Sequence, residues 1–172
     1  MPAWSGPLYV AATLLILAAA PKIRIPDDTA RALRSVGLPG SASLVRLLSV
    51  AELMIGAYAL LVGDRWSAGL VAASYVGFTG FVVLARNRDG VVSSCGCFGT
   101  PDTPPTRSHV VVTALLALGA AGAFLAPAGA VWDLTDHPAQ AVALLLLTGI
   151  CVGFAYLALA VLPTLALATE NS

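Results

Sequence analysis

Charged residues are scarce in this chain. Asp, Glu, Lys and Arg make up 10% of its 172 residues, whereas 58% are hydrophobic. Soluble domains carry about 25% charged residues, so this composition excludes an ordinary soluble globular domain and indicates an integral membrane protein. The nine basic residues are balanced by nine acidic ones. Because there is no excess of positive charge, nothing indicates nucleic acid as a partner, and the lipid bilayer is the expected surrounding.

Cysteine is also rare, and the amino terminus lacks basic residues. Three cysteines are too few for the disulfide framework of a secreted domain. The first 21 residues contain a hydrophobic stretch with an alanine-rich end, as a signal peptide does, but they contain no Lys or Arg. That stretch runs directly into Pro21, which is a poor context for cleavage. We therefore expect a retained first transmembrane helix.

Five hydrophobic stretches are long enough to cross a membrane. A bilayer core of about 30 Å requires roughly 20 helical residues, and lipid cannot satisfy unpaired backbone groups, so these stretches are expected to be helices. The predicted fold class is an all-α integral membrane protein. We expect a single transmembrane domain over residues 1–172, with a four-helix core plus one further helix. The expected helices cover residues 6–20, 44–62, 67–85, 110–126 and 139–162.

The connection after the first of these helices has a helical pattern of its own. In DDTARALRSVGLP, apolar residues fall on one side and arginines on the other: Ala30, Leu33 and Val36 against Arg31 and Arg34. This pattern is typical of an amphipathic helix that lies along the lipid headgroups. An ordinary solvated turn of helix has the same pattern. Either Asp27 or Asp28 is suited to cap the start of the helix.

Basic residues are distributed unequally between the two sides of the predicted bundle. With five helices, the first and third connections lie on the same side. All basic residues except Arg65 fall in or beside these two connections: Lys22, Arg24, Arg31, Arg34, Arg46, Arg86, Arg88 and Arg107. The positive-inside rule makes this side cytoplasmic and places the amino terminus outside.

Two of the three cysteines are separated by a single glycine. The third connection, residues 86–109, contains CGCFG with Cys95 and Cys97. Gly96 can adopt backbone angles closed to other residues. A disulfide across so small a ring stores strain and is easily reduced. An accessible pair of this kind is therefore suited to thiol–disulfide exchange rather than to stabilising the fold. A redox pair is therefore one reading of these thiols, and small residues in a glycine-rich turn are another.

Metal binding is a further alternative for the same segment. Copper and zinc sites use three or four suitable ligands. Cys95 and Cys97 supply two, and His109 could supply a third from the start of the fourth transmembrane helix. Asp102 is the nearest fourth candidate, because His137 belongs to the opposite side of the bundle. This incomplete set disfavours a closed structural site but leaves transient metal transfer open.

Glu52 lies near the centre of the second transmembrane stretch. A carboxylate at this depth is energetically unfavourable and usually functional. Two explanations remain open: the carboxyl group is protonated, or it pairs with Lys22 at the end of the first helix. Arg46 is a poorer partner, because six residues along a helix place the two side chains on different faces. A structural clasp between helices is as consistent with Glu52 as a role in proton transfer or substrate binding.

The last transmembrane stretch holds the third cysteine and a pair of glycines. Cys151 is expected near the middle of this helix, about 15 Å from either surface. It is therefore interpreted as a small buried hydrophobic residue rather than as a resolving thiol. Gly149 and Gly153 have the spacing that lets helices approach closely in lipid. We expect them to pack inside the bundle.

These features together resemble the MauE family of methylamine utilisation proteins, which is grouped with DoxX-like membrane proteins. The features are a first helix ending in APK, the DDTARALRSVGLP segment, a helix with a central Glu52, and CGCFG. They cover roughly residues 8–125, and CGCFG is the most specific of them. The resemblance implies a bacterial plasma-membrane protein that supports thiol or disulfide redox chemistry in exported partners. The founding member assists maturation of a disulfide-rich methylamine dehydrogenase subunit, and relatives work with thioredoxin-like proteins.

By this resemblance, Cys95 and Cys97 would be the redox pair, and Lys22 and Glu52 would assist them. The resulting hypothesis is a membrane thiol–disulfide oxidoreductase, or an accessory to one, that needs no tightly bound cofactor. A quinone is a candidate electron acceptor. The alternatives are a membrane chaperone for copper or zinc and a non-catalytic assembly factor. The family role requires the thiols outside, whereas the basic residues place them in the cytoplasm. Methylamine metabolism itself is not implied by any residue.

Overall fold

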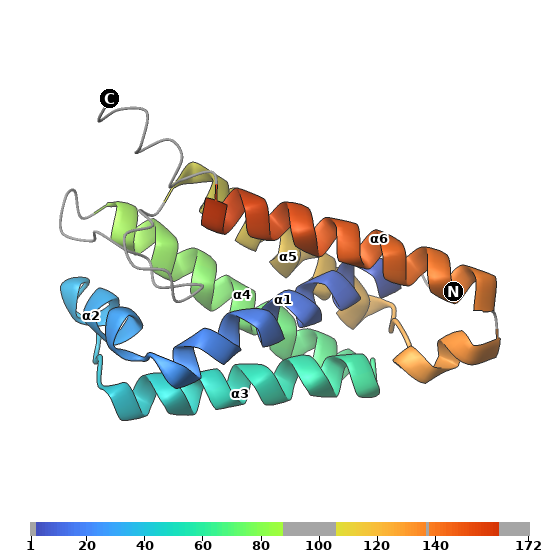
Figure 1. The fold of residues 1–172 in the computed structure, drawn as a ribbon, viewed down its shortest axis with the longest axis horizontal. Coiled ribbons are helices and arrows are strands. Elements are labelled where there is room, and N and C mark those ends of the chain that lie inside the picture. Colours follow the sequence, from blue (N-terminus) through green and yellow to red (C-terminus); the bar gives the residue numbers. More distant parts are fainter. Residues whose placement is uncertain (1–2, 88–105, 137, 162–172) are drawn as a thin grey trace.

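The computed structural model describes residues 3–87, 106–136 and 138–161 (Figure 1). Within these ranges the chain is helical and contains no strand. Five of the helices are long and apolar enough to cross a membrane, as the sequence predicts. They are α1 (Ser5–Arg24), α3 (Ala42–Leu61), α4 (Arg65–Arg86), α5 (Arg107–Leu125) and α6 (Pro138–Tyr156). The predicted fold class is confirmed.

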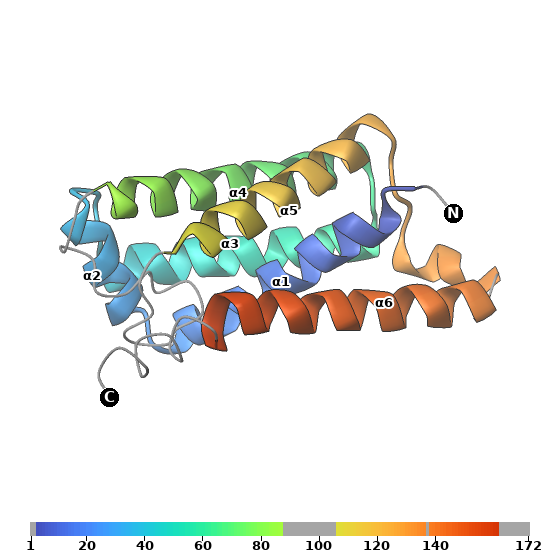
Figure 2. The same cartoon turned by 90° about the horizontal axis from the view of Figure 1, so that it is seen from above.

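Four of the long helices form the core, and the fifth lies beside it. α1 packs against α3 and α5, and α4 packs against α5 and α3. α6 contacts mainly α1, and it runs along the outside of the four-helix group in both views (Figures 1 and 2). The buried core consists mostly of alanine and other small or aliphatic side chains from α1, α3, α4 and α5. These small side chains let the helices approach closely, as is usual in membrane bundles.

α1 extends beyond its predicted end. The hydrophobic stretch stops at residue 20, but the helix continues through Pro21 to Arg24. A proline removes its own N–H from the helix but keeps its carbonyl group, and the Pro21 oxygen accepts a hydrogen bond from the N–H of Ile25 at 2.8 Å. The extra turn carries Lys22, which is 4% exposed. A charged side chain is therefore placed inside the bundle.

The amphipathic segment forms α2 (Asp27–Ser35), which lies at the end of the bundle where α1 ends and α3 begins (Figures 1 and 2). Ala30 and Val36 are buried, whereas Arg31 and Arg34 are exposed, so the predicted faces are correct. The predicted cap is not present. Both aspartates lie within the first turn, where their negative charge interacts favourably with the helix dipole. Neither side chain caps the helix.

The glycine pair in α6 does not pack inside the bundle. Gly149 and Gly153 are both exposed, and a Cβ atom added at either position would meet nothing within 4 Å. The prediction of internal packing is therefore wrong. α6 turns another face toward α1, and the glycines lie on the side that the rest of the described chain leaves open.

Another glycine sets the close approach of α1 and α3. A Cβ atom at Gly56 would lie 2.8 Å from the main-chain oxygen of Ala12 and 2.7 Å from a side-chain carbon of Ile16. Real Cβ atoms do not approach a main-chain oxygen so closely, so any larger residue would push α3 away from α1. Gly80 in α4 is also helical, but a Cβ atom there would meet nothing within 4 Å.

We expect Gly56→Ala to lower the thermal unfolding temperature of the purified protein in detergent. Replacing glycine by alanine within a helix normally stabilises it by about 1 kcal/mol, and the clash with α1 should outweigh this gain. Gly80→Ala is the matched control and should leave the unfolding temperature unchanged or raise it. Equal unfolding temperatures for the two variants would contradict the close contact between α1 and α3.

Asp64 caps α4 outside the membrane-spanning helices. Its Oδ1 accepts a hydrogen bond from the main-chain N–H of Ser67 at 2.8 Å, and its Oδ2 accepts one from the Tyr58 hydroxyl at 3.1 Å. Hydrogen bonding, chiefly from the Ser67 N–H, holds the pKa of the Asp64 carboxyl below its usual value. The folded state therefore favours the ionised form, and this contribution to stability is lost as the pH falls through the lowered pKa.

We expect Asp64→Ala to reduce the free energy of unfolding by about 1 kcal/mol at pH 7, the usual value of a helix cap. Asp64→Asn keeps the accepting oxygen but cannot ionise. Its stability should approach that of the unmodified protein as the pH is lowered from 7 to 3. Unfolding curves at both pH values test this, and a difference between the two proteins that stays constant would show that the charge of Asp64 does not contribute.

Candidate functional site

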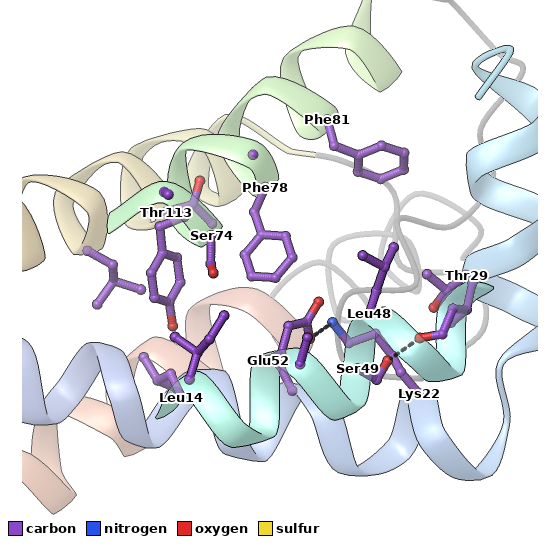
Figure 3. A pocket seen from close by; sticks show the side chains of 18 of the residues that line it. Leu14, Lys22, Thr29, Leu48, Ser49, Glu52, Ser74, Phe78, Phe81 and Thr113 are labelled. Carbon is purple, nitrogen blue, oxygen red and sulfur yellow. Dashed lines mark hydrogen bonds and ion pairs between the residues drawn. The ribbon is translucent and has the colours of Figure 1, made fainter. Parts of the chain in front are cut away.

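A buried ion pair joins α1 to α3. The Lys22 ammonium group donates a hydrogen bond to Oε2 of Glu52, and the side chains are only 5% and 12% exposed (Figure 3). Of the two explanations for Glu52 that the sequence leaves open, the pair with Lys22 is therefore the one observed. Lys22 also lies over the ring of Phe78 from α4, with its Nζ 4.9 Å from the ring centre. This cation–π contact connects the pair to a third helix.

The ion pair lies well inside the bundle. Glu52 is the eleventh residue of α3, so it lies about 15 Å along that helix from its start. Lys22 is two residues from the end of α1. α1 therefore ends beside the middle of α3, and the chain continues into α2 at the end of the bundle. Because α1 ends beside the middle of α3 and does not reach the end of the bundle, it leaves space between α2 and the remaining helices.

A cavity of about 380 Å³ occupies this space. Residues of α1, α2, α3, α4 and α5 line it, together with Leu159. Most of the lining is aliphatic or aromatic, and Phe78 and Phe81 of α4 both face it, as does Leu48 of α3 (Figure 3). The volume lies within the range of about 300–1,000 Å³ that is usual for small-molecule sites.

The cavity reaches the outer surface of the bundle between α3 and α4. Among the residues that line it, Leu48 and Ala51 of α3 are exposed, and so are Ala73 and Gly77 of α4. All four belong to helices that are long and apolar enough to span the membrane. The opening therefore faces the hydrocarbon region of the bilayer, where lipid-soluble molecules are found.

Most polar side chains around the cavity already have partners. The Ser49 hydroxyl donates to the main-chain oxygen of Val45 at 2.8 Å, and the Ser74 hydroxyl donates to that of Leu70 at 2.9 Å. The Tyr75 hydroxyl donates to the main-chain oxygen of Ala11 at 2.8 Å. The Thr113 hydroxyl donates to the main-chain oxygen of His109 at 2.7 Å. The protons of these hydroxyl groups are therefore already donated and are not available to a ligand.

His109 is the exception. It is 1% exposed and lines the cavity from the first turn of α5. Its Nδ1 lies 2.8 Å from the hydroxyl oxygen of Thr106 and accepts a hydrogen bond from the main-chain N–H of the same residue at 3.4 Å, as the third residue of a capping box does. A main-chain N–H can only donate, so this hydrogen bond assigns the accepting role to Nδ1 and the ring hydrogen to Nε2. Nε2 is one of two buried side-chain atoms without a partner among the described residues; the other is Thr148 Oγ1.

The structure brings together three of the five site residues that the sequence indicates. Lys22, Glu52 and His109 all line the cavity. Cys95 and Cys97 lie outside the described residues, as do Asp102 and His137. The cavity itself and its aromatic residues, Phe78 and Phe81, were not predicted. Sequence offers no signal for them, because isolated phenylalanines in a hydrophobic helix usually fill a core.

The described residues contain no group of three His, Cys, Asp or Glu side chains that could hold a metal ion. The proposed metal ligands Cys95 and Cys97 lie outside these residues, so the metal alternative remains a hypothesis. Cys151 is half-buried in α6 and does not line the cavity. It lies thirteen residues after the start of that helix, near the middle of the expected span.

We expect the stabilities of single and charge-exchanged variants to show strong coupling between Lys22 and Glu52. Lys22→Ala or Glu52→Ala leaves the partner charge buried, and each should reduce the free energy of unfolding by about 3–5 kcal/mol. The exchanged pair Lys22→Glu with Glu52→Lys should be more stable than either alanine variant. Unfolding of the four proteins in detergent measures this coupling. Single and exchanged variants of equal stability would show that the ion pair does not hold α1 to α3.

A family model matches most of the chain. The model described as methylamine utilisation protein MauE matches residues 2–127, which include α1 to α5, the ion pair, CGCFG and every described lining residue of the cavity except Leu159. No curated protein and no solved structure matches the chain. Because the family model covers well over half of the sequence, the chain belongs to the MauE family of membrane proteins.

Proposed function

We propose that this protein is a membrane thiol–disulfide redox protein, or an accessory to one, that acts through Cys95 and Cys97. The observation that carries the proposal is the CGCFG sequence, in which two of only three cysteines are one residue apart. Membership of the MauE family supports it, since proteins of that family are expected to support thiol or disulfide redox chemistry in exported partners. The proposed partner is a thioredoxin-like protein or an exported protein that contains disulfides.

The helices on either side of the cysteine segment favour a location near the cavity. α4 ends at Arg86 and α5 begins at Arg107, at the same end of the bundle as α2 (Figures 1 and 2). His109, two residues into α5, lines the cavity.

The proposed chemistry is exchange through a mixed disulfide. A thiolate of the pair attacks a disulfide of the partner, forms an intermolecular disulfide and releases one partner thiolate. The second thiolate then attacks the mixed disulfide, which leaves a Cys95–Cys97 disulfide and a partner dithiol. Two electrons pass from the pair to the partner, and the reverse sequence oxidises the partner. No tightly bound cofactor takes part in this exchange.

Lys22 and Glu52 are proposed as helpers of this chemistry rather than as reacting groups. Their pair holds the end of α1 against α3 and α4, and so keeps the cavity open beside the start of α5. Inside an otherwise apolar region, the Lys22 ammonium can donate a proton and the Glu52 carboxylate can accept one. They are therefore suited to position the site and to take part in proton movement when thiols are oxidised.

The proposed location is a bacterial plasma membrane, with two expectations for the side of the cysteine segment. The helix order places the end of α1, the end of α4 and the start of α5 at one end of the bundle. The basic residues there favour the cytoplasm. A role in maturing exported proteins favours the opposite side. The side is therefore the first property that an experiment should establish.

We expect a membrane-impermeant maleimide of high mass to label Cys95 and Cys97 only after mild reduction. Labelling in sealed cells would place an oxidised pair outside, and labelling in inverted vesicles would place it in the cytoplasm. The Cys151→Ser variant should give the same two mass shifts, because Cys151 is not part of the pair. Variants with Cys95→Ser or Cys97→Ser should trap a mixed disulfide with the partner, which non-reducing gels detect.

Two results would contradict the proposal. Thiols that label equally before and after reduction would show that no disulfide forms. Thiols that become protected when copper or zinc is added, with no trapped partner in the single-cysteine variants, would favour the metal-binding alternative.

A further inference from the structure

Nε2 of His109 is a hydrogen-bond donor without a partner among the described residues. Nδ1 faces the main-chain N–H and the hydroxyl of Thr106, so the ring hydrogen is assigned to Nε2, which is buried at the wall of the cavity. A buried donor without a partner destabilises the folded state. The cavity is therefore suited to a ligand that presents an acceptor, such as a carbonyl oxygen, to this nitrogen.

The remainder of the cavity sets the other properties of the ligand. Its walls are mostly apolar, and its polar hydroxyl groups already donate to main-chain oxygens, so most of the ligand must be apolar. The rings of Phe78 and Phe81 face the cavity and can stack on a flat ring (Figure 3). Exposed Leu48 and Gly77 line its opening to the bilayer. A lipid-soluble molecule with a planar ring and a carbonyl group fits all three features.

The ion pair adds a feature that a simple lipid chain would not need. Lys22 and Glu52 lie on the same cavity wall and carry the only charges among its described lining residues. A ligand that takes up protons when it is reduced needs proton-transferring groups at this depth; the Lys22 ammonium can donate a proton, and the Glu52 carboxylate can accept one. Burying this pair is unfavourable for a cavity that binds only hydrocarbon.

We propose that the cavity binds a quinone, with one carbonyl oxygen accepting a hydrogen bond from Nε2 of His109. The redox role of this ligand rests on the proposed function: the dithiol of Cys95 and Cys97 becomes a disulfide and releases two electrons and two protons. The quinone takes up the same two electrons and two protons and becomes the hydroquinone. Binding of the quinone in the cavity does not itself require the cysteines.

The test is quinone binding to the full-length protein with both Cys95→Ser and Cys97→Ser, so that no thiol reaction can occur. Binding of a short-chain ubiquinone to this protein in lipid nanodiscs is measured by calorimetry. We expect saturable binding that falls at least about tenfold with His109→Phe, which removes the donor. His109→Gln should restore much of the affinity, because glutamine retains a donor and can complete the capping box at its position.

Thr148→Val is the matched control. Thr148 holds the other buried side-chain atom without a partner among the described residues, but it does not line the cavity, so its replacement should leave quinone affinity unchanged. Oleate tests for nonspecific occupation by a lipid chain. A ubiquinone affinity that is equal in the His109→Phe variant, or oleate binding as tight as quinone binding, would overturn the proposal.

The outcome can be separated from that of the proposed function. If quinone binds as expected but the labelling experiment finds no disulfide in the unmodified protein, the cavity site stands and the redox function of the cysteines fails. If the disulfide and the trapped partner are found but no quinone binds, the thiol function stands and the quinone site fails.

Discussion

The ion pair between Lys22 and Glu52 is the interaction on which the geometry of the site depends. An ammonium group and a carboxylate inside a membrane bundle are tolerated only when they neutralise each other. Their contact requires α1 to end beside the middle of α3, because Lys22 lies near the end of one helix and Glu52 near the centre of the other. The early end of α1 leaves a space that α2 and the neighbouring helices surround. The pair thus determines where the cavity lies and places an ammonium group and a carboxylate in its wall.

The cavity combines three properties that an ordinary packing defect lacks. It opens toward the bilayer between α3 and α4, and it contains an ion pair without net charge. It is also lined by His109, whose Nε2 has no partner among the described residues and whose ring is held by the start of α5. Defects in a membrane bundle normally have only hydrocarbon walls. An amphipathic redox ligand at this position would connect the membrane to the segment that carries Cys95 and Cys97, since α5 begins immediately after that segment.

Much of the fold could be predicted because it depends on local sequence. Long apolar runs give the five spanning helices, and the buried carboxylate of Glu52 requires a partner, of which Lys22 is the nearest in depth. The end of α1 was placed too early, because Pro21 interrupts the hydrophobic run without ending the helix. The packing of Gly149 and Gly153 was predicted wrongly, because spacing alone does not tell which face of α6 meets α1. The cavity could not be predicted, because its lining residues are spread from Leu14 to Leu159 and come together only through the packing of five helices.

The most direct test of the account combines the cavity and the cysteines in one reaction. The reduced protein is reconstituted in liposomes without oxygen, a short-chain ubiquinone is added, and free thiols and hydroquinone are both quantified over time. The account predicts that each hydroquinone formed accompanies the loss of two thiols, and that His109→Phe slows both changes equally. Hydroquinone formation without thiol loss, or thiols that remain reduced in excess quinone, would contradict it.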